Sequence, residues 1–346
     1  AYIHAVCSEL EMRKEYLGGE TIETIYWGGG TPSQLDKEDF ETIFYYLHKN
    51  YSISSHPEIT LEANPDDLTP DYIAMLRTLP FNRLSMGIQT FNESILKVLQ
   101  RRHTARQAIE AFQNCRAAGF QNISIDLMYG LPGETLSTWQ QDLDQALLLH
   151  PEHLSAYHLI YEEDTVLWKL REQHKVEEAD EDLSASLFST LKDRPTSEGY
   201  DHYEISNFSL PGLYSRHNSS YWTEKKYLGC GPSAHSYNGV SRQWNVASLD
   251  TYIKGISAGT PVFEIEELDL YTRYNDFVIT RIRTEWGMPL SKLRDEFGEK
   301  LYDYCLRMAA PHLKQGTLEL VNDILKLTRK GIFISDGIMS DMLWTD

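Results

Sequence analysis

The chain has 346 residues, of which 41% are hydrophobic and 24% charged, a composition typical of a folded globular protein and not of a disordered one. Its 51 acidic residues oppose 32 basic ones, so the net charge at pH 7 is −19 and most of the surface would repel a nucleic-acid backbone. No apolar stretch reaches the roughly 18 residues that a membrane-spanning helix needs. The sequence therefore argues against nucleic acid as a partner and against an integral membrane protein.

A helix is predicted over residues 1–17, where apolar residues recur three and four positions apart. No capping residue precedes this helix, so we expect a further segment upstream of Ala1. A β-branched and aromatic run predicts a strand at 22–27. A glycine-rich loop at 28–33 and a helix at 37–49 follow it.

The same strand-and-helix unit then recurs along the chain. Its predicted strands are 58–62, 83–89, 122–128 and 153–160, and its predicted helices are 70–79, 93–99, 105–118, 136–149 and 180–191. Strands that alternate with helices in this way indicate an α/β fold with a parallel sheet, either open or closed into a barrel, and we favour a barrel.

The pattern changes toward the end of the chain. Two later strands are predicted at 200–208 and 233–237, and from about Ser248 the periodicity becomes helical. Residues 330–342 have the pattern of a short terminal hairpin. We therefore predict two domains, 1–240 and 241–346.

Polar residues stand where four successive predicted strands end: the glycine loop, Glu62, Gln89 and Asp126. In a parallel barrel the chemistry gathers at these strand ends. Asp126 is the most informative, because it interrupts an apolar run and a buried carboxylate is costly unless it is paired or hydrogen-bonded. Glycines at 28–30 would let a ligand approach the backbone, and few basic residues lie nearby, so a polar, partly cationic ligand is expected rather than a phosphate.

Each of these residues also has a structural interpretation. The glycines can form an ordinary turn, Glu62 and Gln89 can be caps or surface groups, and Asp126 can belong to a structural ion pair. The coincidence at four strand ends favours a binding site.

Four motifs in order resemble the radical S-adenosylmethionine family of oxygen-independent coproporphyrinogen III oxidases. They lie at residues 26–33 (Tyr-Trp-Gly-Gly-Gly-Thr-Pro-Ser), 62–65 (Glu-Ala-Asn-Pro), 83–91 (Arg-Leu-Ser-Met-Gly-Ile-Gln-Thr-Phe) and 125–133 (Ile-Asp-Leu-Met-Tyr-Gly-Leu-Pro-Gly). Within that family the chain is most similar to the haem-chaperone branch, HemW, rather than to the porphyrin-forming branch, HemN. The resemblance implies a partial (β/α) TIM-like barrel of the radical SAM type with a small, mostly helical, winged-helix-like C-terminal domain.

The resemblance also implies a 4Fe-4S cluster and S-adenosylmethionine as cofactors. By motif, Gly29, Gly30 and Thr31 would meet the methionine end of S-adenosylmethionine. The rest of its pocket would be lined by Glu62, Gln89, Arg101 and Asp126, with Arg102 as an alternative match to Arg101 and the backbone near Leu159 and Ile160 against the adenine.

The cysteines of the chain depart from the family pattern. In the family, three cysteines spaced Cys-x3-Cys-x2-Cys hold the cluster, whereas Cys7, Cys115, Cys230 and Cys305 are scattered. We expect the first strand and the cluster cysteines upstream of Ala1, with no metal ligand in this chain. Scattered thiols fit a reducing cytoplasm.

Residues 217–222 (His-Asn-Ser-Ser-Tyr-Trp) resemble the signature of the haem-chaperone branch. Histidine is a common haem ligand and aromatic residues suit the macrocycle, so His217 is a candidate haem ligand, although a loop histidine is more often simply hydrogen-bonded or exposed. The segment at 229–236 also resembles a family motif. Its glycines and proline suit a turn, and His235 is a second-rank site candidate.

The resemblance implies a haem chaperone that delivers haem to acceptor haem proteins, among them membrane-bound respiratory enzymes. An oxygen-independent coproporphyrinogen III oxidase is the alternative, and no catalytic residue is assigned in either case. The resemblance is also compatible with a homodimer.

Overall fold

The computed structural model describes residues 1–345 of the chain. These divide into two compact units, one of Ala1–Ile25, Leu35–Pro57 and Arg216–Asp346 and the other of Tyr26–Gln34 and Glu58–Ser215. Each unit combines separate stretches of the sequence. The predicted domain boundary between residues 240 and 241 is therefore not tested by this division and stays a prediction. Within the described residues, no helix combines the length and apolar character needed to cross a membrane.

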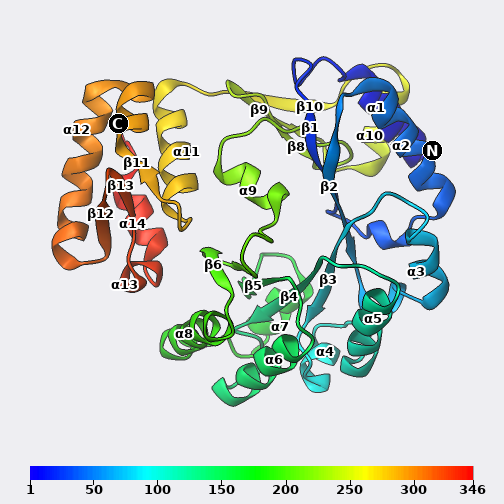
Figure 1. Ribbon diagram of the computed structural model, residues 1–346, viewed down its shortest axis with the longest axis horizontal. Helices are drawn as coiled ribbons and strands as arrows, with labels where there is room; N and C mark the ends of the chain where they lie inside the picture. The colour runs from blue at the N-terminus through cyan, green and yellow to red at the C-terminus, as the bar shows by residue number, and fades with distance from the viewer. Residues whose placement is uncertain (346) are drawn as a thin grey trace. The chain divides into compact units, whose positions relative to one another are not determined.

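The main sheet has seven strands (Figure 1). Their order in the sheet is β1 (Ile22–Trp27), β2 (Ile53–Ala63), β3 (Arg83–Gln89), β4 (Ile123–Tyr129), β5 (His153–His158), β7 (Asn207–Ser209) and β6 (Asp201–Glu204). Strands β2 to β5 pair in parallel, as the alternating pattern predicts, and together with the helices they form the predicted α/β part-barrel.

Two strand predictions need correction. The predicted strand at 200–208 is an antiparallel hairpin, β6 and β7, because the chain reverses at Ile205 and Ser206. The predicted strand at 233–237 is the short β8 (His235–Tyr237), which belongs to a separate three-stranded sheet and not to the part-barrel.

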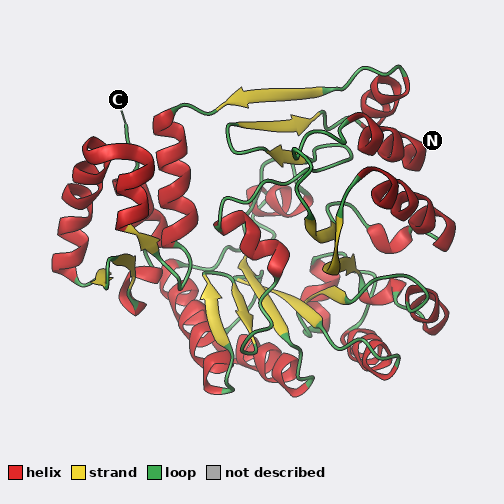
Figure 2. Cartoon of the chain, turned by 45° about the horizontal axis from the view of Figure 1, so that its top comes forward, coloured by secondary structure: helices red, strands yellow, loops and turns green. Residues whose placement is uncertain are grey.

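Helices of the second unit follow its strands and run along the outer side of the sheet (Figure 2). They are α3 (Pro70–Leu76), α4 (Glu93–Val98), α5 (Ala105–Ala117), α6 (Leu136–Leu148), α7 (Val166–Glu172) and α8 (Glu181–Ser197), of which α7 was not predicted. Thr104 and Thr135 begin α5 and α6 with capping boxes, which satisfy amides that the helix leaves free. The buried side chains of Leu84, Ile125 and Trp139 form part of the core.

The first unit contains α1 (Tyr2–Met12), α2 (Lys37–Asn50), α9 (Arg216–Trp222), α10 (Leu249–Ser257) and an antiparallel sheet of β10 (Phe263–Glu267), β9 (Ser241–Asn245) and β8. A buried carboxylate, Glu9 of α1, joins these elements. It accepts hydrogen bonds from Arg13 Nη1 (3.0 Å), Gly231 N (2.9 Å), Asn245 Nδ2 (2.8 Å) and Tyr252 Oη (2.6 Å). Because every contact to this carboxylate is charge-assisted, the network fixes α1 against β9 and α10.

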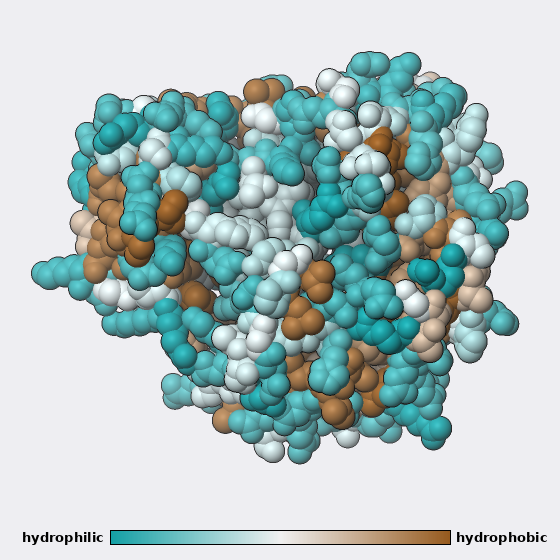
Figure 3. Space-filling model, viewed as in Figure 1, coloured by the Kyte–Doolittle hydropathy of each residue, from teal (hydrophilic) through white to brown (hydrophobic). Residues whose placement is uncertain are grey.

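The C-terminal part of the first unit contains α11 (Leu270–Ile282), β11 (Met288–Pro289), α12 (Leu290–Gln315), β12 (Leu318–Val321), β13 (Ile324–Leu327), α13 (Arg329–Ile332) and α14 (Ser335–Met342). The predicted hairpin at 330–342 is wrong, because these residues form α13 and α14. The hairpin is β12 and β13, turned by Asn322 and Asp323 in the left-handed region. Hydrophilic residues dominate the face of the molecule in Figure 3.

Candidate functional site

The residues predicted for S-adenosylmethionine all fall in the second unit. The glycine loop follows β1, Glu62 lies near the end of β2, Gln89 ends β3 and Asp126 is a central residue of β4. Because neighbouring parallel strands point the same way, their carboxyl ends share one edge of the sheet. Arg101 reaches the same edge from the loop between α4 and α5.

The Glu62 carboxylate accepts hydrogen bonds from the glycine loop and from the strand residue before it. Its Oε1 accepts the Tyr26 hydroxyl at 2.7 Å and its Oε2 accepts the Gly29 amide at 3.2 Å. A Cβ at position 28 would lie 2.7 Å from Glu62 Oε1 and 2.6 Å from the Tyr26 ring, so any side chain there would displace the Glu62 carboxylate or the Tyr26 ring. Burial, followed by the charge of Glu62, raises the pKa of Tyr26, which keeps the phenol a hydrogen-bond donor.

Gly29 and Gly30 form an open, exposed cradle next to this carboxylate. A Cβ at either position would meet no atom within 4 Å, and Gly29 adopts a φ of +93°, which L side chains rarely adopt. Thr31 follows them directly and is also exposed. The backbone here is bare enough for a ligand to lie against it.

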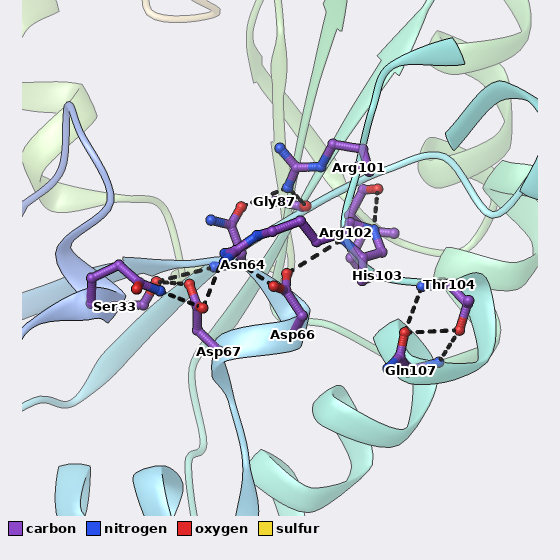
Figure 4. A network of polar contacts seen from close by, with 12 residues as sticks. Ser33, Asn64, Asp66, Asp67, Gly87, Arg101, Arg102, His103, Thr104 and Gln107 are labelled. Carbon is purple, nitrogen blue, oxygen red and sulfur yellow. Dashed lines mark hydrogen bonds and ion pairs between the residues drawn. The ribbon is translucent and has the colours of Figure 1, made fainter. Parts of the chain in front are cut away.

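Arg101 and Arg102 point to different partners (Figure 4). Arg102 Nη2 pairs with Asp66 and Asp67, each at 3.0 Å, in the short 3₁₀ turn Pro65–Asp67 after β2. Arg101 Nη2 instead donates to Asn64 Oδ1 at 2.6 Å and to the Gly87 carbonyl at 2.8 Å. Arg101 Nε is buried without a hydrogen-bond partner, and burial lowers the pKa of this guanidinium. Arg101 is therefore the arginine that stands at the strand ends with an unused donor.

A bulge at the end of β3 brings Gln89 next to Arg101. The register with β4 shifts between Gly87 and Gln89, and Gln89 has a left-handed φ of +69°. A Cβ at position 87 would lie 3.1 Å from Gln89 Nε2 and 3.5 Å from Arg101 Nη2, so both side chains reach Gly87. The amide and the guanidinium thus form one group of donors.

Asp126 is held by two serines that the sequence analysis missed. Ser85 Oγ lies 3.0 Å from each carboxylate oxygen, and Ser124 Oγ lies 3.3 Å from Oδ1. Ser124 also bonds the buried His153 ring at Nδ1 (2.8 Å), whose Nε2 meets the Tyr203 hydroxyl at 2.7 Å. A signal was present, since both serines interrupt apolar strands and Ser124 stands two residues before Asp126 on the same face.

The electrostatics of Asp126 suit a cationic ligand. Burial, followed by the charge of Glu62, raises the pKa of Asp126 to about 6, while Arg83 and the two serines oppose this rise. A carboxylate with a raised pKa next to a second carboxylate gains most when a positive group binds.

The end of β5 offers an apolar surface in the same unit. Leu159 is buried and its amide donates to the Tyr129 carbonyl at 2.8 Å, whereas the Ile160 side chain is 75% exposed. An exposed isoleucine beside fixed backbone is a suitable contact for a flat ring.

His217 lies in the first unit, at the start of α9. Its Nδ1 is 2.9 Å from Thr24 Oγ1, its Nε2 is 2.9 Å from the Tyr221 hydroxyl, and the two rings meet edge to face at 5.1 Å. The Thr24 contact fixes the ring, and the exposed Tyr221 hydroxyl is the contact that a ligand at Nε2 would replace.

All four cysteines are free thiols, and Cys7, Cys115 and Cys305 are buried. Among residues 1–345, no three side chains of His, Cys, Asp or Glu are grouped in a way that could hold a metal ion. The residues at hand therefore do not fit an iron–sulfur cluster.

The chain matches two protein-family models and is similar in sequence to haem chaperones. Residues 7–146 match the radical SAM superfamily model and residues 268–334 match the HemN C-terminal domain model. The chain is 32% identical over 343 residues to the haem chaperone HemW of Mycobacterium tuberculosis, covering 99% of this chain and 86% of that one. It is also 32% identical over 349 residues to HemW of Lactococcus lactis, covering 100% and 90%.

The solved structure of coproporphyrinogen III oxidase (HemN) from Escherichia coli, described as a radical SAM enzyme, superimposes with a TM-score of 0.84 at 22% identity, covering 99% of this chain and 82% of that one. At this level of identity the match establishes the fold.

Proposed function

We propose, from the premise that this chain belongs to the HemW family within the radical SAM superfamily, that it is a haem chaperone: it binds haem and passes it to acceptor haem proteins. The observation that carries the proposal is the similarity to HemW proteins along the whole chain. We assign His217 as a haem ligand through Nε2, with Nδ1 held by Thr24. Membrane-bound respiratory enzymes are included among the acceptors, and the free cysteines suit a cytoplasmic location.

The strand-end residues fit S-adenosylmethionine. Gly29, Gly30 and Thr31 leave the backbone open for its methionine end, and the carboxylates of Glu62 and Asp126 would attract its positive charges. The guanidinium of Arg101 and the amide of Gln89 would be further donors for its carboxylate and ribose oxygens.

When bound beside an iron–sulfur cluster, this cofactor supplies radical chemistry. The cluster would need ligands beyond residues 1–346. The residues of this chain would bind and orient the cofactor. The hydroxyls of Ser85 and Ser124 donate to the Asp126 carboxylate and fix its orientation, and Glu62 fixes the glycine loop by accepting the Gly29 amide.

Haem titration followed by the Soret band tests the proposal. We expect the wild type to bind haem and His217→Ala to bind about tenfold more weakly or worse, a difference of about 1.4 kcal/mol. His4→Ala, which removes an exposed imidazole from α1 and leaves His217 in place, is the matched control. Absence of haem binding by the wild type would contradict the chaperone role, and turnover of coproporphyrinogen III would then support the oxidase alternative.

A further inference from the structure

A row of buried polar residues crosses four strands of the sheet in the second unit. Ser85 of β3 is paired with Ser124 of β4, Ser124 with His153 of β5, and His153 with Ser209 of β7. All four are buried. Paired residues project on the same face of a sheet, and Asp126, two residues after Ser124, projects on that face as well. His153 therefore lies inside the part-barrel on the side that carries the Asp126 carboxylate.

His153 differs from the two histidines that the sequence analysis named. His217 and His235 lie in the first unit, and the exposed His235 ring stacks on the Trp244 ring with centroids 6.2 Å apart. His153 is completely buried at the start of β5 in the second unit. Burial, followed by the charge of Arg83, holds the pKa of His153 well below its ordinary value. The ring is therefore neutral, so one of its nitrogens donates a hydrogen bond and the other accepts one.

The hydrogen bonds around His153 fix which nitrogen carries the proton. An ionised carboxylate can only accept, so the Ser124 hydroxyl, 3.3 Å from Oδ1 of Asp126, donates to it. Ser124 Oγ then accepts from Nδ1 of His153 at 2.8 Å, and Nε2, which is left without a proton, accepts the Tyr203 hydroxyl at 2.7 Å. The donors thus follow one direction, from the Tyr203 hydroxyl to the Asp126 carboxylate.

Tyr203 of β6 is suited to be the first donor of this chain. Its side chain is completely buried, and its ring contacts the His153 ring at 5.7 Å and the Tyr214 ring at 4.9 Å between centroids. Burial raises the pKa of Tyr203, whereas a hydrogen bond from the Ser215 backbone opposes this rise. A contact that lowers the pKa of a phenol donates to its oxygen. The phenol proton is therefore available for Nε2 of His153.

We propose that His153 and Tyr203 are positioning residues of the S-adenosylmethionine site: the Tyr203 hydroxyl holds His153 as the Nδ1–H tautomer, which turns the Ser124 hydroxyl toward Asp126. The inference rests on the proposed function, because that function assigns Asp126 to the cofactor. With the other tautomer, the Ser124 proton would be donated to Nδ1 and a lone pair of Ser124 Oγ would face the carboxylate. The charged form of Asp126 would then lose a donor that stabilises it for a cationic ligand.

Other charged and titratable groups act on Asp126 from the neighbouring strands. They are Tyr26 of β1, Glu62 of β2, Arg83 of β3 and Tyr157 of β5, and Glu204 of β6 acts on Tyr157 and Tyr203. Burial raises the pKa of both Tyr26 and Tyr157, so these phenols stay uncharged at neutral pH. The substitution Tyr203→Phe leaves all five groups in place. A change in pH dependence between the variant and the wild type therefore reports on the chain of donors.

NMR of the full-length protein with isotope-labelled histidine tests the tautomer, because the nitrogen chemical shifts distinguish an Nδ1–H ring from an Nε2–H ring. The signal of His153 is the one that disappears in His153→Gln. We expect the Nδ1–H form in the wild type at about pH 8, and a ring that stays neutral down to about pH 5. Tyr203→Phe should admit the Nε2–H form. The control Tyr200→Phe, which removes another buried hydroxyl that donates to the Pro151 carbonyl, should not. An Nε2–H ring in the wild type would overturn the inference.

Calorimetric titration with S-adenosylmethionine, on cluster-reconstituted full-length protein, tests the consequence for the site. Tyr203→Phe should bind more weakly than the wild type. Its loss of affinity should be greater at about pH 6 than at about pH 8 by about twofold or more, because Asp126 takes up its proton at higher pH once Ser124 no longer donates to it. Tyr200→Phe should match the wild type at both pH values. An equal loss at both pH values would mean that Tyr203 acts only on the fold, and would overturn the inference.

Failure of the proposed function gives a different result. A wild type with the Nδ1–H tautomer that does not bind S-adenosylmethionine would overturn the cofactor site, and with it the role of His153 and Tyr203. Binding of S-adenosylmethionine by a wild type with the Nε2–H tautomer would overturn the inference alone. Absence of haem binding would contradict the chaperone role and leave the tautomer and the S-adenosylmethionine titration as support for the inference.

Discussion

Replacement of Asp126 by Asn should change how the stability of the fold depends on pH. The ordinary pKa of an aspartate is 3.8, and in the folded chain the pKa of Asp126 is raised to about 6. The folded state therefore holds this proton more tightly than the unfolded state. The contribution of Asp126 to the free energy of unfolding is greatest below about pH 4 and falls as the pH rises through about 6.

This rise in the pKa of Asp126 corresponds to a free energy of about 3 kcal/mol, since each pKa unit is worth about 1.4 kcal/mol. Asp126→Asn keeps an oxygen that accepts a serine hydroxyl but carries no charge. The variant should thus gain up to about 3 kcal/mol relative to the wild type between about pH 4 and about pH 7.

Urea unfolding at a series of pH values measures this difference. Glu134 and Asp142 also have raised pKa values, about 7 and about 6, but both are present in the wild type and the variant and their effects cancel. Equal pH dependence of the two proteins would refute the argument.

Ser85→Ala provides a second check on the same carboxylate. Its hydroxyl donates to both oxygens of Asp126 and stabilises the charged form. Its removal should move the transition of the wild-type profile to higher pH. A shift to lower pH, or none, would mean that the hydrogen bond does not favour the carboxylate.

Four further substitutions test other parts of the structure. Gly28→Ala should displace the Glu62 carboxylate, which would lie 2.7 Å from the new Cβ, and calorimetry should show S-adenosylmethionine binding about tenfold weaker or worse. Glu9→Gln should lower the free energy of unfolding in urea by about 3 to 5 kcal/mol, because it leaves the buried guanidinium of its salt-bridge partner uncompensated; a loss below about 1 kcal/mol would contradict this. Arg101→Lys should weaken S-adenosylmethionine binding in calorimetry while Arg102→Lys does not, and the reverse order would show that the wrong arginine was assigned.

The strand ends of the second unit could be predicted because their signals are local. Strands of a parallel sheet are nearly continuous apolar runs, so the end of each run is visible, and a polar residue such as Asp126 stands out even though it is central in β4 and not at its end. The partners of these residues depend on pairing between strands. Ser85 lies beside Ser124 only because β3 and β4 pair in that register, which a single sequence does not reveal.

The errors near the C-terminus have a physical cause in tertiary contacts. Gly331 lies in a helix and not in a turn, and a Cβ at this position would lie 1.8 Å from the Thr317 carbonyl oxygen. The glycine is needed for close packing and not for chain reversal. Likewise α9 was missed since none of its residues is buried, so no apolar stripe marks it as a helix.

The residues assigned to S-adenosylmethionine and those assigned to haem come from different units, which makes their relation measurable. If haem changes the affinity for S-adenosylmethionine by some factor, then S-adenosylmethionine must change the affinity for haem by the same factor. A pair of titrations, each with and without the other ligand, therefore has an internal check. A factor of one would mean that each unit binds its own ligand independently, and Asp126→Asn should then leave haem binding by His217 unchanged. A factor other than one would mean that binding at one site changes the affinity of the other site for its ligand.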